Sequence, residues 1–297
     1  MMDPDPLTGK EFVMYVILGG TGRVGSAVAR ALLDQEQAVA IVTRDESHGE
    51  EMRKAGAAIA VADIRDVDSL RGIFRSGRRA FLLNPPADPT GDTDQEERGN
   101  VAAIMSALEG SGLEKVVAQS TYGAFEGSRC GDLTVLHEFE QALLRQSIPA
   151  AINRGGYYMS NWAGMAEMVR ESGMLLSFFP ADLPIGMVAP TDLGEAAALR
   201  LMSGTEDVGI KHIEGPDRYT ANDVAAAFAR AMDREVTVEE VARDALESSF
   251  REMGFSDKAA ASYACMTRRV IDGKTDTADD PIRGSVSLQS YIASIAA

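Results

Sequence analysis

Residues 13–25 constrain the fold of this chain more than any other stretch. An apolar run at 13–18 has the length of a buried strand, and the glycine-rich segment GGTGRVG follows it at 19–25. The next residues, 26–33, have the apolar spacing of a helix, with Val28 and Leu32 on one stripe. A strand, a glycine turn and a helix in this order predict a dinucleotide-binding unit, because the backbone can approach a pyrophosphate at the helix N-terminus.

The glycines of this turn fit two spacings. Gly20, Gly22 and Gly25 form G-x-G-x-x-G, whereas Gly19, Gly22 and Gly25 form G-x-x-G-x-x-G. The alternative is a turn that only packs a helix on a strand, but the correct flanking elements favour a cofactor site. The candidate cofactor contacts in the turn are Gly19, Gly20, Thr21, Gly22, Arg23, Val24 and Gly25.

Strands and helices alternate along the first half of the chain. Strands are predicted at 13–18, 38–43, 57–62, 79–83, 115–119 and 148–153, with helical patterns between them. This alternation predicts βαβ units and an α/β fold with a doubly wound parallel sheet. After residue 155 the alternation of strand and helix patterns ends, and short apolar segments and mostly helical patterns follow. We therefore expect a dinucleotide-binding domain at 1–155 and a smaller, mostly helical domain at 156–297, parts of which can pack back on the first.

Charge and hydropathy exclude several classes of partner. The 297 residues have a formal net charge of −16, which disfavours nucleic acid and anionic membranes. No apolar run approaches the ~20 residues of a membrane helix. The first six residues, MMDPDP, do not resemble a signal peptide, so we expect a cytoplasmic protein, monomeric or homodimeric.

The cysteines and histidines do not suggest a metal site. Cys130 and Cys265 form neither a disulfide framework nor a metal pair, so we expect two plain thiols. His48, His137 and His212 are far apart and lack metal-ligand spacing.

The end of the second predicted strand indicates the type of cofactor. Sites for NAD usually have an acidic residue there, which binds the ribose hydroxyls, whereas this chain has Thr43 and Arg44. An arginine can pair with the 2′-phosphate of NADP, and Arg23 adds a second positive group. We therefore expect NADP(H), with NAD(H) kept possible by Asp45, one residue further. The alternative for Arg44 is a solvated surface arginine.

Polar residues at other predicted strand ends complete the expected cofactor site. Asp63 can accept a hydrogen bond from the adenine amino group, with Ile64 packing on the ring; alternatively, Asp63 caps the next turn. Asn84, Pro85 and Pro86 end the fourth strand, where the backbone would pass the middle of the cofactor. Ser120 ends the fifth, near the expected place of the nicotinamide.

Together, these motifs resemble the NmrA-like branch of the atypical short-chain dehydrogenases. The resemblance spans roughly residues 13–240. The matching segments are GGTGRVG at 19–25, Asp63 with Asp66, Ser69 and Leu70, NPP at 84–86, and RGGYYMSN at 154–161. The resemblance implies an NADP-binding Rossmann domain with a small C-terminal domain. Members include quinone, ether and flavonoid reductases, and catalytically silent redox sensors.

The usual proton relay of short-chain dehydrogenases is missing. Their Tyr-x-x-x-Lys motif does not occur, and Leu136 stands where some NmrA-like enzymes have a lysine. Tyr122 and His137 are the candidate proton donors, because one is a hydroxyl at a strand end and the other titrates near neutral pH. The alternatives are an aromatic residue in the core and a half-buried helix histidine.

Two functions fit these observations. The first is an NADPH-dependent reductase for a small conjugated acceptor such as a quinone, whose reduced form needs little help with protonation. The side chains expected to line the acceptor site are Tyr122, Tyr157, Tyr158 and Trp162. Alternatively, this aromatic segment forms an interdomain core. The second is a sensor of NADPH that acts through a protein partner, for which acidic loops at 88–97 and 275–280 offer surfaces.

Overall fold

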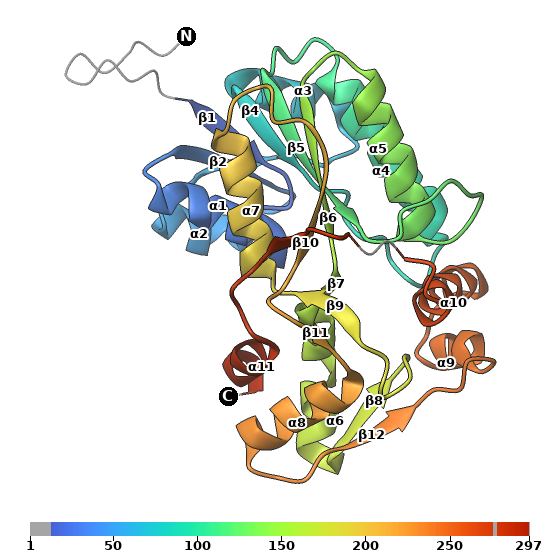
Figure 1. Ribbon diagram of the computed structural model, residues 1–297. Helices are drawn as coiled ribbons and strands as arrows, with labels where there is room; N and C mark the ends of the chain where they lie inside the picture. The colour runs from blue at the N-terminus through green and yellow to red at the C-terminus, as the bar shows by residue number, and fades with distance from the viewer. Residues whose placement is uncertain (1–12, 276–277, 297) are drawn as a thin grey trace.

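The computed structural model describes residues 13–275 and 278–296 (Figure 1). The first six residues, on which the absence of a signal peptide was judged, lie outside these ranges, as do positions 276 and 277 of the acidic loop predicted at 275–280. Among the described residues, none of the helices combines the length and apolarity that a membrane span requires.

A parallel sheet of eight strands forms the centre of the molecule, in the order β13-β10-β6-β5-β4-β1-β2-β3. Its strands are β1 (Met14–Ile17), β2 (Ala38–Thr43), β3 (Ala58–Val61), β4 (Arg79–Leu82), β5 (Lys115–Thr121), β6 (Ala150–Gly155), β10 (Gly209–Glu214) and β13 (Ile282–Arg283). All their pairings are parallel. The predicted doubly wound α/β fold is confirmed. The strand order reverses between β1 and β4, the switch point at which such sheets bind ligands.

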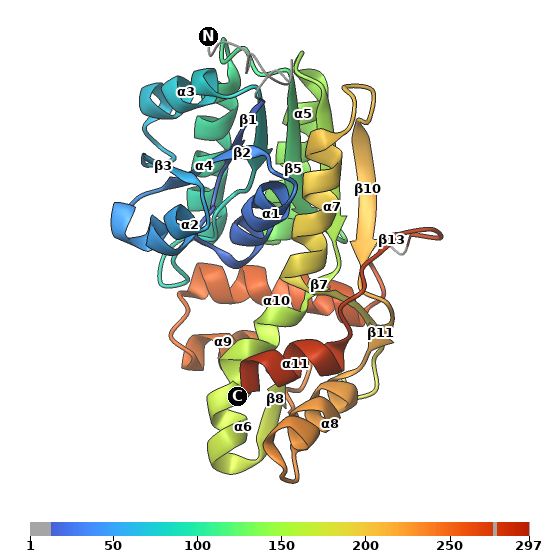
Figure 2. The ribbon, with the colours of Figure 1, turned by 90° about the vertical axis from the view of Figure 1, so that its left-hand side faces the viewer.

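Helices cover both faces of this sheet (Figures 1 and 2). One face carries α1 (Arg23–Asp34) and α7 (Pro190–Met202), which pack side by side; a Cβ on Gly194 would lie 2.6 Å from the Ala27 backbone. The other face carries α3 (Val67–Ser76), α4 (Thr93–Leu108) and α5 (Asp132–Arg145). The short elements η1 (Glu46–Gly49) and α2 (Glu50–Lys54) connect β2 to β3. Buried aliphatic and aromatic side chains fill both layers.

A smaller lobe lies beyond the carboxyl ends of the strands. Its sheets are β11-β9-β7 and β12-β8. The strands are β7 (Tyr157–Tyr158), β8 (Met174–Ser177), β9 (Ile185–Val188), β11 (Arg218–Tyr219) and β12 (Thr237–Glu240). The helices are η2 (Met159–Met165), α6 (Ala166–Ser172), α8 (Ala221–Met232), α9 (Leu246–Glu252), α10 (Asp257–Ile271) and α11 (Leu288–Ala296). Figure 2 shows α10 running across the end of the central sheet, between the sheet and the rest of the lobe.

The chain after residue 155 also contributes to the central layers. Strand β10 pairs with β6, β13 pairs with β10, and α7 packs on α1. The sequence predicted six strands and missed β10 and β13. Four of the six residues of β10 are not buried, and its polar residues Lys211 and His212 hide the strand pattern.

A disulfide joins Cys130 to Cys265, with 5.3 Å between their Cα atoms. The prediction of two plain thiols was wrong. The cysteines are 135 positions apart in the sequence and meet because α10 packs against the start of α5. A pairing this distant cannot be found from the spacing of two cysteines.

The acidic loop predicted at 88–97 is partly helix. Helix α4 begins at Thr93, with Asp92 as its N-cap, accepting a hydrogen bond from the Gln95 backbone. Asp94 and Glu97 are 0% and 3% exposed. Charged residues are almost always solvated, so their sequence suggested a surface loop.

Candidate functional site

The glycine turn connects β1 to α1 at the switch point of the sheet. Gly19 has a φ of +64°, in the left-handed region that favours glycine. A Cβ on Gly25 would lie 2.1 Å from the Gly19 carbonyl oxygen, and one on Gly20 would lie 2.4 Å from the Ile41 side chain. Because these two contacts are closer than atoms allow, glycine is required for the turn to close.

The N-terminus of α1 is open to an anion. Its N-cap, Gly22, has no side chain to cap the first N–H groups, and its first turn contains no acidic residue. Gly22 and Thr21 are exposed, whereas Val24 packs in the core beside Val28. The free N–H groups and the helix dipole favour a phosphate at this point.

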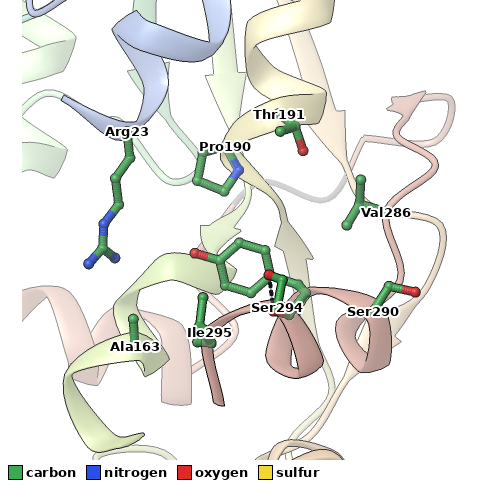
Figure 3. A pocket seen from close by; sticks show the side chains of 9 residues that line it. Arg23, Ala163, Pro190, Thr191, Val286, Ser290, Ser294 and Ile295 are labelled. Atoms are coloured by element: carbon green, nitrogen blue, oxygen red, sulfur yellow. Dashed lines mark hydrogen bonds between the residues drawn. The ribbon is translucent and has the colours of Figure 1, made fainter. Parts of the chain in front are cut away.

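Arg23 extends from the turn toward the smaller lobe. Its Nη1 donates a hydrogen bond to the Ser160 carbonyl oxygen in η2. It also borders an open pocket of about 490 Å³ (Figure 3). The other lining residues come from η2, α7, α11 and the segment before α11: Ala163, Pro190, Thr191, Val286, Ser290, Tyr291, Ser294 and Ile295. Arg23 therefore joins the glycine turn to the lobe that faces it.

The end of β2 presents one exposed cation. Arg44 is exposed, and no described residue pairs with its guanidinium group. Thr43 is buried, and its hydroxyl donates to the Asp45 carbonyl oxygen at 3.0 Å. The Asp45 carboxylate accepts hydrogen bonds of 2.8 Å from the backbone and hydroxyl of Ser47, which lower its pKa. The acid that could have bound a ribose thus caps η1, and the arginine is left available.

At the end of β3, Asp63 stabilises a turn. Its carboxylate accepts a hydrogen bond of 2.8 Å from the Arg65 backbone, and its carbonyl oxygen accepts one from the Asp66 backbone. The side chain remains exposed, and Ile64 packs partly against the core.

The loop after β4 carries an amide with no partner. Both side-chain polar atoms of Asn84 are buried and make no hydrogen bond within the described part of the chain. Pro85 and Pro86 follow it, and the Ala87 N–H then donates to Glu97 Oε1 at 3.1 Å. A buried amide normally has partners, so Asn84 is suited to a bound molecule.

At the end of β5, the side chains of Ser120 and Tyr122 pack against neighbouring elements. Ser120 is buried and donates to Glu140, which also forms an ion pair with Arg154 at 2.7 Å. The Tyr122 ring packs edge-on against His212, with 5.1 Å between centroids, and burial and the nearby Glu214 carboxylate raise its pKa. Its hydroxyl is therefore on the β10 side of the sheet, not beside the glycine turn.

The aromatic side chains expected to line the acceptor site divide into two groups. Tyr157 packs edge-on against Trp162 and Phe179, with centroids 5.9 and 5.2 Å apart, in the core of the smaller lobe. Trp162 is 3% exposed. Tyr158 instead packs against the core of the α1 and α7 layer and lies near Gln119 and Asp132, close to the ends of β5 and β6.

His137 lies in the second turn of α5. The side chain is half-buried, and Nδ1 makes no hydrogen bond with any residue that the structure describes.

Two carboxyl groups that the sequence did not single out face each other near the strand ends. Glu97 lies in the second turn of α4 and Asp132 is the first residue of α5; each acts on the pKa of the other through a hydrogen bond. Burial, as the largest cause, raises both pKa values. No local signal marks these residues, because they are brought together only by the packing of α4 on α5.

This arrangement of glycine turn, strand ends and covering lobe matches a known family. The model of the NmrA-like family matches residues 14–268. The chain belongs to the NmrA-like family. The resemblance found in the sequence motifs is thereby confirmed.

Two relatives match most of the chain. It is 24% identical over 271 residues to an NAD(P)H azoreductase from Xenophilus azovorans, covering 89% of this chain and 91% of the relative. It is 26% identical over 239 residues to a (4-alkanoyl-5-oxo-2,5-dihydrofuran-3-yl)methyl phosphate reductase from Streptomyces griseus, covering 80% of each chain.

Solved structures share the fold over nearly the whole length. The triphenylmethane reductase of a Citrobacter species, complexed with NADP(H), has a TM-score of 0.79 and 17% identity, covering 96% of this chain and 100% of that one. The NADPH-dependent quinone oxidoreductase of Escherichia coli, complexed with NADPH, has a TM-score of 0.78 and 17% identity, covering 95% and 99%.

Proposed function

We propose that this protein is an NADPH-dependent oxidoreductase that reduces a small conjugated acceptor such as a quinone. One observation carries the proposal: an open glycine turn at the switch point lies on the same sheet edge as Arg44, an arginine at the end of β2 that pairs with no described residue. The reduced nicotinamide, when bound, supplies the hydride.

The residues present fit this cofactor at three places. The exposed Gly22 backbone and the N–H groups of α1 suit the pyrophosphate. Arg44 suits the 2′-phosphate, since the competing Asp45 carboxylate caps η1. The unpartnered amide of Asn84 suits a polar group at the middle of the cofactor. NADP(H) is therefore the preferred cofactor, with NAD(H) as a weaker ligand.

The acceptor would lie between the strand ends and the smaller lobe. Tyr158 is the aromatic side chain best placed to contact it, while Tyr157 and Trp162 support the lobe from within its core. The names of the relatives support a conjugated acceptor, since azo dyes, quinones and triphenylmethane dyes all delocalise the charge that a hydride brings.

The test is oxidation of NADPH by the purified protein in the presence of quinones and azo dyes, followed by the absorbance of reduced nicotinamide. Turnover with at least one acceptor, lost in Gly22→Val, supports the proposal. Nucleotide binding without turnover across a broad panel would contradict it.

The second candidate function is a sensor that binds NADPH and signals to a protein partner. The hydroxyl of Ser120 favours it, since it donates to Glu140 and is not free to transfer a proton. A pull-down with and without NADPH separates the two: partner binding that depends on the nucleotide supports the sensor, and identical results count against it.

Tyr122 and His137 stay predictions as proton donors, and Tyr122→Phe tests the first. Its hydroxyl is buried against Glu214, so we expect the variant to keep most of the activity of the wild type. A large loss of kcat with unchanged NADPH binding would instead support a catalytic role.

A further inference from the structure

Glu97 and Asp132 form a carboxyl pair at the end of the sheet where the acceptor would bind. Glu97 is 3% exposed, and the Ala87 backbone, in the loop that ends β4, donates to its Oε1. Its Oε2 is buried and receives no hydrogen bond from a fixed donor in the described ranges. The carboxyl groups of Glu97 and Asp132 lie within hydrogen-bonding reach of each other, and such a bond requires a proton on one of the two, because carboxylates can only accept.

The surroundings of the pair favour retention of this proton. Burial is the largest cause of the raised pKa values, and the Asp94 carboxylate raises both further. The arginine on α4 that could neutralise the pair, Arg98, forms ion pairs with Glu138 and Asp94 instead. Like charges in one site cannot both ionise easily, so such a pair keeps one proton into the neutral range.

The other titratable groups around the pair come from the elements that pack on it. Helix α10 contributes Tyr263, whose pKa is raised by burial and by both carboxyls, and Ser262, which donates to Asp94. The end of β6 contributes Tyr158, whose pKa is raised by burial and by Asp132. No cation faces the pair among these groups. Across the described residues, no three His, Cys, Asp or Glu side chains are grouped to hold a metal ion.

Asp132 is the member of the pair that a ligand can reach. Its side chain is exposed at the surface, although protein atoms surround it closely enough for burial to dominate its pKa. Glu97 lies behind it, away from solvent. Asp132 is also near Tyr158, the aromatic side chain best placed to contact an acceptor.

We propose that Asp132 is the general acid that protonates the reduced acceptor, with the buried Glu97 carboxylate as the positioning group that keeps the shared proton on Asp132. This inference rests on the proposed reductase function. For an azo acceptor, hydride forms an N–H bond at one nitrogen, and the electron pair of the N=N π bond moves to the other. That nitrogen takes the proton from Asp132, and the resulting carboxylate regains a proton from water.

The pair also accounts for the absence of a tyrosine–lysine relay. A carboxylic acid held protonated near neutral pH performs the same transfer, because efficient acids have pKa values near the working pH. A quinone needs this acid less than an azo dye does, since the reduced quinone is a weakly basic anion. A variant that has lost only proton transfer should therefore be impaired with the azo dye and remain active with the quinone, whereas a variant that has lost hydride transfer should be impaired with both.

The experiment measures kcat and KM with a benzoquinone and with an azo dye for wild type, Asp132→Asn, Glu97→Gln and the control Glu109→Gln, which alters an exposed acid at the far end of α4. We expect Asp132→Asn to lower kcat for the azo dye by about 10²-fold, to lower kcat for the quinone by less than about threefold, and to leave NADPH binding unchanged. Glu97→Gln should shift the alkaline limb of the kcat profile to lower pH, because the neighbouring negative charge is gone. Formate should partly rescue Asp132→Ala with the azo dye.

The outcomes separate this inference from the proposed function. Wild type that oxidises NADPH with neither acceptor contradicts the proposed function, and the inference falls with it. Wild type that reduces the quinone but not the azo dye, or an Asp132→Asn variant that is equally active with both, overturns the inference alone. Equal losses with both acceptors and weaker NADPH binding would show a structural role and would also overturn it.

Discussion

Replacing Arg44 with alanine should weaken NADPH binding and leave NADH binding unchanged. Arg44 is exposed and unpaired with any described residue, so its removal leaves no buried group without a partner and should not affect folding. The two nucleotides differ only in the 2′-phosphate. A change confined to NADPH therefore reports contact with that group.

The magnitude follows from the exposure of the site. Hydrogen bonds to charged groups contribute about 1.5–3 kcal/mol, and solvent screening at an exposed arginine favours the lower end. A loss of about 1.5 kcal/mol corresponds to roughly a tenfold increase in the Kd of NADPH. For NADH, we expect a change of less than about twofold.

The assay is a titration of nicotinamide fluorescence with each nucleotide at fixed ionic strength. Arg53→Ala is the matched control, because Arg53 is also an exposed arginine close to β2 in the chain but forms ion pairs with Glu46 and Glu50. The control should leave both Kd values unchanged. If Arg44→Ala weakens the binding of NADPH and NADH equally, or weakens the binding of neither, Arg44 does not bind the 2′-phosphate.

Three further perturbations test the turn, the disulfide and a buried ion pair. Gly22→Ala is compatible with the local φ of −84° but adds a methyl group to the exposed turn. The affinities for NADPH and NADH should therefore fall by similar factors in fluorescence titrations. The control Gly72→Ala should change neither affinity, because the added Cβ would have no atom within 4 Å. Reducing the disulfide opens a loop of 135 residues and should lower the free energy of unfolding in urea by up to about 5 kcal/mol; an unchanged midpoint would contradict this. Burial alone would raise the pKa of Asp207, but hydrogen bonds from Arg200, Lys211 and Ser203 lower it overall. Its contribution to stability is therefore present above pH ~4 and lost as pH falls, so Asp207→Asn should destabilise the protein at pH 7 and flatten its acid denaturation curve; equal slopes would argue against this role.

Most of the central sheet could be predicted from the sequence. Strand β2 begins and ends where expected, and five others differ by only a few residues, because buried parallel strands are continuous apolar runs between turns. Strand β10 could not be predicted in this way. Its partner β6 lies more than 50 positions earlier, and its partly exposed, polar sequence acquires a strand geometry only by pairing.

The candidate cofactor site, too, could be predicted only where it depends on local sequence. The glycine turn and Arg44 follow from local sequence, since a turn that needs glycine and a strand end that bears an arginine are each visible within a few residues. The structure changes the roles of residues farther along the chain: the hydroxyl of Ser120 is engaged by Glu140, and Tyr157 and Trp162 pack in the core of the smaller lobe.

The sequence by itself thus determined the strand–turn–helix unit, the doubly wound sheet and the family, because these depend on short-range periodicity and on glycines in fixed positions. Only the tertiary structure brought Cys130 to Cys265 and Glu97 to Asp132. Both contacts join residues of separate elements, and the second raises the pKa of each carboxyl chiefly through burial. Burial is a property of the packed chain, so the chemistry of this pair cannot be found until α4, α5 and α10 have been placed together.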